Sequence, residues 1–341
     1  MSTTITSNHN QSIFLEPLEQ LIRNINLPND KNFLFYSLFS SIDKYFVDFV
    51  RYLENNADYD FIVLHFPFES PDFYKCINPL YQYAIKRCQA KFAVIDCGEK
   101  LDHCTHFKFN TFYNEDHHTW IPANPSQRFY KFFCANRILK PHRILLLEKL
   151  LKIKAEDNIV TAGNFNIDQE FNKMINFSAP IVAPDEKILL DQSFESQRRM
   201  PESFINSIFS IVTESSYDNV GDVFETWSRI MTTEKTIKAY RLYHLPIFLA
   251  PAGHVEAQRQ LGFDVFDDII DHSYDRCLDP YHRIDMIIDL CKWINAKSIN
   301  HWQKICQSLW TRLDANNSNC KKIAQVEYKT LVNNLISWTR Q

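Results

Sequence analysis

The sequence predicts an α/β protein with two sheets, because short apolar runs alternate with segments of helical spacing in both halves of the chain. In the first half, residues 60–66 form one such run, closed by a proline, and residues 91–96 form another, closed by Cys-Gly. Continuous apolar runs of this length are typical of strands buried on both faces of a parallel sheet. Residues 73–87 between them are spaced as the crossover helix of a β-α-β unit.

The first 53 residues show a different pattern. Residues 1–11 are polar and predict a flexible tail, whereas residues 13–25 carry apolar side chains at helical spacing. Residues 32–53 do so more densely, with an aromatic stripe that we interpret as part of a helix facing the core. Residues 107–126 are irregular and rich in histidine and aromatic residues, which places a domain boundary near their end.

The second half repeats the alternation of strands and helices. The expected strands are residues 129–134, 158–161, 207–213 and 246–250. The expected helices are residues 143–153, 235–243, 255–261, 281–294 and 298–313. The sequence therefore predicts three parts: an N-terminal α/β domain with leading helices over 1–125, a second α/β domain over 126–300, and C-terminal helices over 301–341.

Composition excludes several classes of function. The 341 residues include only five glycines, and no two of them fall within one motif length, which excludes a glycine-rich dinucleotide or phosphate loop. A formal charge of −4 gives no electrostatic basis for general nucleic-acid binding. No apolar run is long enough to span a bilayer, and the polar N-terminus does not resemble a secretory signal. The nine cysteines form no CxxC pair, so we expect reduced thiols and a cytoplasmic protein.

The segment from Thr232 to Thr236 is the densest candidate for a binding site. Threonine favours helix N-caps, but the charge of Lys235 in a first turn opposes the helix dipole. A helix N-terminus together with an ammonium group suits a phosphate, and the neighbouring Glu234 is able to accept hydrogen bonds from sugar hydroxyls. The alternative is that Lys235 simply extends into solvent.

A second basic helix start follows the expected strand 129–134. Arg143 and His142 fall in the first turn of the next helix, whereas Arg137 and Lys140 are expected to be solvated. Ligands of open α/β sheets bind beyond the carboxyl ends of the strands, so two basic helix starts there reinforce each other.

The first half offers weaker candidates. Glu69 follows the strand 60–66 and is a possible general base if it faces a cleft, although a plain loop carboxylate is the alternative. Two groups resemble metal ligands without the spacing of a structural zinc site: Asp102, His103, Cys104 and His106, and Glu115, Asp116, His117 and His118. Asp58 and Asp60 have the DxD form that holds a metal diphosphate. They precede their strand, which is the wrong end for ligand binding, so we reject them as a metal site.

The order of these motifs resembles the donor-binding region of the α1,3-fucosyltransferases. Glu214-Ser-Ser after a strand, then Thr233-Glu-Lys, then a helix and Leu245-Pro-Ile match that family's pattern. The resemblance implies a GT-B-like fold, with two facing Rossmann-like domains, here with helical N- and C-terminal extensions. It implies that residues 1–125 form the acceptor-side domain and that residues 126–300 form the nucleotide-sugar-binding domain. It also implies that Lys235 and Arg143 bind the diphosphate of a sugar nucleotide, that Glu234 contacts donor hydroxyls and that Glu69 is the base.

Residues 129–290 are also similar to a wider group of viral and bacterial glycosyltransferase-like proteins. The shared segments are Asn136-Arg…His142-Arg, Thr233-Glu-Lys-Thr, and Gly262-Phe-Asp-Val-Phe…Asp271-His-Ser-Tyr-Asp. The donor-binding residues expected from both resemblances are Asn136, Arg143, Glu214, Thr233, Glu234 and Lys235.

The sequence therefore predicts a metal-independent glycosyltransferase that moves a sugar from a nucleotide sugar to a hydroxyl of a glycan, protein or other acceptor. No cofactor is expected besides the donor itself. Two alternatives stay open: a non-catalytic interaction module with the same fold, and another nucleotide-handling transferase such as a phosphotransferase.

Overall fold

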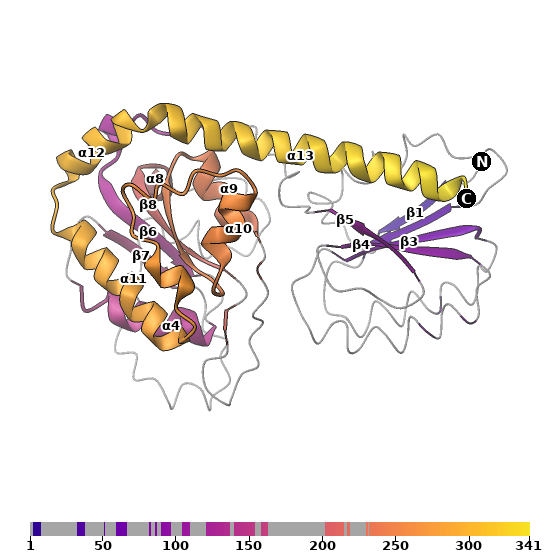
Figure 1. Ribbon diagram of the computed structural model, residues 1–341, viewed down its shortest axis with the longest axis horizontal. Coiled ribbons are helices and arrows are strands. Elements are labelled where there is room, and N and C mark those ends of the chain that lie inside the picture. The colour runs from indigo at the N-terminus through magenta and orange to yellow at the C-terminus, as the bar shows by residue number, and fades with distance from the viewer. Residues whose placement is uncertain are drawn as a thin grey trace. The chain divides into compact units, whose positions relative to one another are not determined.

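A computed structural model of the chain forms two compact units, one made of Met1–Asp116 with Lys321–Gln341 and the other of His117–Cys320 (Figure 1). The structure describes residues 3–7, 33–37, 51, 59–66, 82, 86, 90–96, 104–109, 121–136, 140–153, 158–162, 202–214, 217–218, 230 and 232–341. The predicted α/β class is confirmed, because each unit contains a parallel sheet and helices connect or cover the strands.

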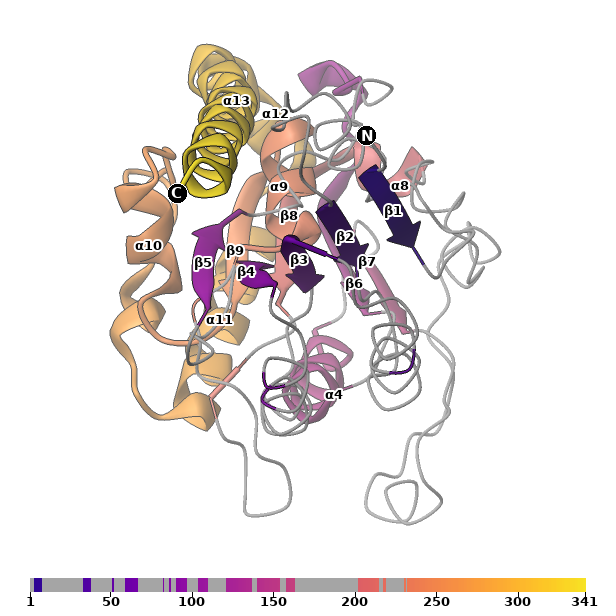
Figure 2. The ribbon, with the colours of Figure 1, turned by 90° about the vertical axis from the view of Figure 1, so that its right-hand side faces the viewer.

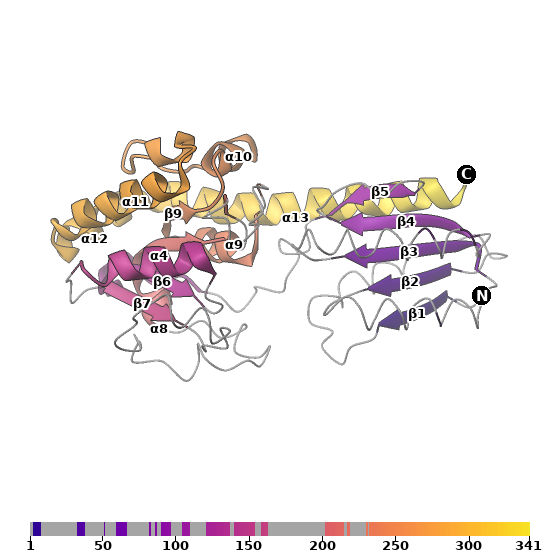
Figure 3. The same ribbon diagram turned by 90° about the horizontal axis from the view of Figure 1, so that it is seen from below.

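The sheet of the first unit has five parallel strands in the order β1-β2-β3-β4-β5 (Figures 2 and 3). They are β1 (Thr3–Ser7), β2 (Phe33–Ser37), β3 (Phe61–Phe66), β4 (Lys91–Asp96) and β5 (Thr105–Lys108). The spatial order follows the order along the chain, so consecutive strands are hydrogen-bonded neighbours. The central strands are buried, which explains their uninterrupted apolar sequences.

The core of this unit lies between one face of the sheet and the last turns of helix α13 (Trp310–Thr339). The Trp338 ring lies 5.1 Å from the ring of Phe61 and 6.1 Å from that of Phe107, in edge-to-face geometry in both pairs. Leu331 and Leu335, at helical spacing along the same helix, are fully buried in this cluster. Burial of each such side chain stabilises the fold by roughly 1.5–3 kcal/mol, which ties the C-terminal helix to the N-terminal sheet.

The sheet of the second unit has four parallel strands in the order β7-β6-β8-β9. They are β6 (Tyr130–Asn136), β7 (Asn158–Ala162), β8 (Ser207–Thr213) and β9 (Leu245–Leu249). The helices of this unit are η3 (Pro125–Gln127), α4 (Pro141–Leu150), α8 (Glu202–Ile205), α9 (Glu234–Arg241), α10 (His254–Gln260), η4 (Ser273–Arg276), α11 (Pro280–Asn295) and α12 (Ile299–Ser308), followed by the start of α13.

Buried polar contacts hold these elements around the sheet. Helix α11 packs beside α4 (Figure 1) and also contacts β9, while α9 contacts β8 and β9. Arg128, which is fully buried, donates to the carbonyl oxygens of Ser207 at 2.7 Å and Leu242 at 2.8 Å. The indole of Trp302 is buried under the sheet and donates to the carbonyl of Ile294 at 2.9 Å. Each of these bonds is accepted by a backbone carbonyl near the end of an element, which fastens that end in place.

Several sequence expectations are corrected. Residues 3–7 form the edge strand β1 rather than part of a flexible tail, and residues 33–37 form β2 rather than the start of a helix over 32–53. The irregular segment 107–126 begins inside β5. The single helix expected over 298–313 is two helices, α12 and α13, with Leu309 between them.

Other expectations agree with the structure or fall outside it. All six runs expected as strands in the two halves are strands of these sheets. Residues 82 and 86 of the expected crossover helix are helical, whereas residues 13–25 lie outside the described residues. Along the chain, the two compact units meet between residues 116 and 117, and residues 321–341 belong to the first unit. The division into functional domains near residue 125 stays a prediction. None of the helices in the described part of the chain is both long enough and apolar enough to cross a bilayer.

Candidate functional site

The carboxyl ends of β6 and β8 bring together the two basic helix starts that the sequence singles out. Helix α4 begins at Pro141, after β6, and helix α9 begins at Glu234, after β8. Proline suits the first position of a helix because its missing N–H has no intrahelical partner there. The N-cap of α4, Lys140, makes no side-chain capping bond.

Arg143 reaches from α4 to the end of β8. Its Nη2 donates to the carbonyl oxygens of Thr213 at 2.8 Å and Glu214 at 3.0 Å. Only 3% of the residue is exposed. The guanidinium group therefore fixes the end of β8 against the first turn of α4, and its positive charge lies beneath the surface at this edge of the sheet.

Thr233 is the N-cap of α9 and supports Lys235 in two ways. Thr233 Oγ1 accepts from the backbone N–H of Lys235 at 3.3 Å and from its Nζ at 3.2 Å. Lys235 Nζ also lies 3.0 Å from Glu234 Oε1, and the side chains of Lys235 and Glu234 are 26% and 21% exposed. The ammonium group is thus held over the helix N-terminus, and part of the Lys235 side chain is open to solvent.

Glu214 connects the two helix starts. Its carboxylate is fully buried and accepts from Thr233 Oγ1 at 2.5 Å, Thr236 Oγ1 at 2.6 Å and the N–H of Thr233 at 3.3 Å. Its main-chain carbonyl accepts from Arg143 and lies 3.1 Å from His142 Nε2. Because both carboxylate oxygens have close donors, the Glu214 side chain serves as a brace between β8 and α9.

Nearby cations shift the pKa values of a histidine and a carboxyl group at this edge. Burial, together with the nearby charge of Arg143, holds the pKa of His142 well below its usual value, and Lys140 and Lys235 act in the same direction. His142 is therefore neutral at pH 7, so its Nε2 donates to the carbonyl of Glu214 as N–H. Burial alone would raise the pKa of Glu234, but the ammonium groups of Lys235 and Lys238 hold it below its usual value.

A second layer of buried residues supports the edge from behind. The ring of His142 stacks on the ring of Tyr217, with 4.9 Å between their centres. The guanidinium of Arg283 lies 5.3 Å from the centre of the Tyr217 ring. Arg283 donates to Asp218, to the carbonyl of Ala250 at 3.0 Å and to the carbonyl of Cys277 through Nε at 2.9 Å. Sequence reasoning missed this layer, because Arg283 lies 65 positions from Asp218 and belongs to no local motif.

Thr232, next to the N-cap, is fastened to helix α10. Gln258 Nε2 donates to Thr232 Oγ1 at 2.8 Å, and the same nitrogen lies 3.4 Å from His254 Nε2. Burial lowers the pKa of His254 to about 4, although Asp275 opposes that shift. The start of α9 is therefore held from both sides, by Glu214 and by α10.

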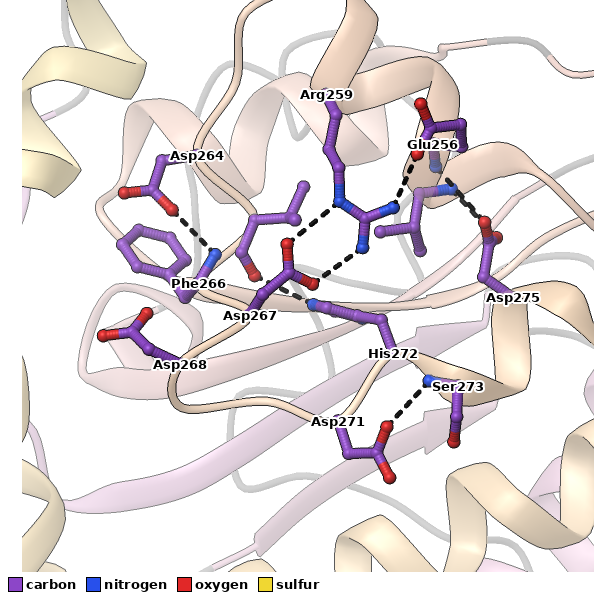
Figure 4. Close-up of polar contacts among 12 residues, drawn as sticks. Glu256, Arg259, Asp264, Phe266, Asp267, Asp268, Asp271, His272, Ser273 and Asp275 are labelled. Carbon is purple, nitrogen blue, oxygen red and sulfur yellow. Dashed lines mark hydrogen bonds and ion pairs between the residues drawn. The ribbon is translucent and has the colours of Figure 1, made fainter.

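The acidic segment 262–275 has a structural role in the second unit (Figure 4). Asp275 accepts from the N–H groups of Val255 at 2.9 Å and Glu256 at 3.2 Å, and so caps the start of α10. The carboxylate of Asp267 accepts hydrogen bonds from Arg259 Nε at 3.0 Å and from Arg259 Nη2 at 2.7 Å. The imidazole of His272 lies 2.8 Å from the carbonyl of Val265 through Nε2. These groups have partners in α10 and within the segment itself, which assigns them a structural role.

Arg312 at the start of α13 continues this network. Its guanidinium binds the carboxylates of Asp264 and Asp268, and it lies 5.1 Å from the centre of the Phe266 ring. Phe266 has a φ of 63°, a left-handed conformation that an aromatic residue rarely adopts. The contacts of Arg312 on both sides of Phe266 hold the turn in this conformation.

The remaining candidates have different outcomes. Asn136 is buried at the end of β6, where its Nδ2 lies 3.3 Å from Cys134 Sγ. Glu69, His103 and the segment 115–118 lie outside the described residues. Cys104 and His106 form a close pair, with Cys104 Sγ 3.1 Å from His106 Nε2. Among the residues that the structure describes, no three His, Cys, Asp or Glu side chains come together as a metal site would need.

This edge of the sheet therefore combines two helix N-termini, one partly exposed lysine side chain and one buried guanidinium group, and Glu214 connects the two helix starts. Comparison of the chain with protein-family models, with curated proteins and with solved structures finds no match.

Proposed function

We propose that the carboxyl edge of the second sheet binds the diphosphate of a nucleotide sugar, and that the protein is a glycosyltransferase. The observation that carries the proposal is the position of Lys235, held by Thr233 over the N-terminus of α9 with its side chain 26% exposed. Backbone N–H groups at a helix start and an ammonium group at hydrogen-bonding reach form a site that suits phosphate oxygens.

The roles of the two basic residues differ in this proposal. Lys235 contacts the diphosphate directly, and a phosphate oxygen competes with Glu234 for its ammonium group. Arg143, only 3% exposed and bonded to two carbonyl groups, acts as a positioning residue that fixes the edge and adds positive potential. Glu214 and Thr233 hold the start of α9 in place, and Asn136 ends the strand that leads to α4.

The proposed reaction breaks the bond between the anomeric carbon of the sugar and its diphosphate oxygen. An acceptor hydroxyl forms the new bond to that carbon and gives its proton to a base, for which Glu69, outside the described residues, is our candidate. Negative charge grows on the departing diphosphate, and in this proposal Lys235 and the two helix N-termini stabilise it. The proposal includes the GT-B-like pairing of two Rossmann-like domains and, because the described cysteines are free thiols, a cytoplasmic location.

A thermal-shift screen against nucleoside diphosphate sugars, followed by an assay of product with candidate acceptors, tests the function. A ligand present at 100 times its dissociation constant should stabilise the protein by about 2.7 kcal/mol. We expect one nucleotide sugar to bind and to release its nucleoside diphosphate in the presence of EDTA. Binding without release would favour the non-catalytic alternative. The absence of binding by any nucleotide sugar would contradict the proposal, and strict dependence on a nucleoside triphosphate and a divalent ion would favour a phosphotransferase.

A further inference from the structure

A cysteine and a histidine meet at the start of β5 in the first unit, outside the elements that form the proposed diphosphate site. Cys104 Sγ lies 3.1 Å from His106 Nε2, which is within reach for a proton shared between thiol and imidazole. The two residues are two positions apart, so their side chains extend from the same side of the strand. The alternate positions, Phe107 and Phe109, point into the core that contacts α13.

The exposure of Cys104 distinguishes it from most described cysteines. Cys104 and Cys277 are partly exposed, whereas the four others are buried: Cys134, Cys291, Cys306 and Cys320. Burial raises the pKa of the Cys134 thiol to about 12, which keeps it protonated and unreactive. His106 is also only partly buried, so reagents have access to both members of the pair.

We propose that Cys104 is a modification site, at which a thiol activated by His106 exchanges with small disulfides. The imidazole takes the thiol proton, and the thiolate attacks one sulfur of the disulfide. A bond forms between Cys104 Sγ and that sulfur as the original S–S bond breaks, and the departing thiolate takes the proton back from His106. The product is a mixed disulfide and a free thiol, and no other oxidant or reductant is needed.

Cys277 is a matched internal control for this chemistry. Its thiol is also partly exposed, but its hydrogen-bond partner is the carbonyl of Asp279, at 3.4 Å, which cannot take a proton. At pH 7 an ordinary thiol is only about 3% thiolate, so complete activation would raise the thiolate population about thirtyfold. A more acidic thiol is a weaker nucleophile, which reduces the expected advantage of Cys104 to about tenfold.

The test exposes the full-length protein to 2-hydroxyethyl disulfide at pH 7 and follows each cysteine by peptide mass spectrometry. We expect Cys104 to form its mixed disulfide about ten times faster than Cys277 in the same sample. Equal rates at the two cysteines would overturn the proposal, and this comparison needs no variant.

The variant His106→Gln then tests the role of the imidazole. It should lower the rate at Cys104 about tenfold and leave the rate at Cys277 unchanged, and circular dichroism should confirm that the variant is folded. A folded His106→Gln protein in which Cys104 reacts as fast as before would also overturn the proposal. Neither measurement depends on nucleotide-sugar binding, so its outcome is independent of the proposed function.

Discussion

The substitution Thr236→Val tests whether the carboxylate of Glu214 braces the start of α9. Valine has nearly the same shape as threonine but lacks the hydroxyl that donates to Glu214 Oε1 at 2.6 Å. The carboxylate is fully buried, and its Oε1 would keep only the N–H of Thr233 at 3.3 Å. A hydrogen bond to a charged group contributes roughly 1.5–3 kcal/mol, so the free energy of unfolding should fall by about that amount.

Thermal unfolding gives the measurement, with Thr236→Ser as the control that keeps the hydroxyl. For a unit of about 200 residues, each kcal/mol corresponds to about 2–4 °C, so the Tm should fall by about 3–12 °C. Hydrogen exchange should also accelerate in α9, since its first turn loses a restraint. The reasoning would be refuted if Thr236→Val and Thr236→Ser unfolded at the same temperature as the unaltered protein.

Two further predictions concern buried groups of the second unit. Burial lowers the pKa of His254 to about 4 from 6.5, so the unfolded chain binds the proton first. The contribution of neutral His254 to stability is complete above pH 6.5 and is lost as the pH falls toward 4. In urea denaturation, His254→Gln should therefore reduce the pH dependence of the free energy of unfolding over that range. In the same assay, Arg283→Met should lower the free energy of unfolding by about 3–5 kcal/mol, because Asp218 and the carbonyls of Ala250 and Cys277 lose this partner. A loss below 1 kcal/mol would contradict the role assigned to that guanidinium.

The sequence predicted the buried strands β3, β4 and β8 well and the first two strands of the first sheet badly, for a physical reason. Strands β3, β4 and β8 are buried, so their sequences are nearly continuous apolar runs, and such runs predict a strand. The five residues of β1 are Thr, Ile and Ser at the edge of the sheet, and such a polar stretch reads as a tail. Strand β2 is short and lies in an aromatic stretch whose spacing also fits a helix, so periodicity alone wrongly predicted a helix there.

The candidate site was predictable only where the local sequence marked a helix start with a basic residue in its first turn. Lys235 and Arg143 oppose the dipole in the first turns of their helices. In the structure Arg143 donates to the carbonyl of Glu214, and Thr233, which contacts Lys235, donates to the Glu214 carboxylate. The buried functions of Arg143 and Glu214 were not predictable, because they depend on pairing between β8 and the two helices. The contact of Gln258 with Thr232 and the stack of His142 on Tyr217 likewise depend on tertiary packing that no local pattern carries.

Calorimetric titration of GDP and UDP into the protein and its Lys235→Ala variant tests the central claim, that this ammonium group binds a diphosphate. The matched control is Lys152→Ala, which removes the same charge from a side chain that is 72% exposed beyond the far end of α4. A charge-assisted bond of roughly 1.5–3 kcal/mol predicts that Lys235→Ala weakens diphosphate binding about tenfold to hundredfold. Guanosine and uridine, which lack phosphate, should not distinguish the variant from the unaltered protein. Unchanged affinity of Lys235→Ala for the nucleoside diphosphate that the unaltered protein binds, or an equal loss in Lys152→Ala, would contradict the account.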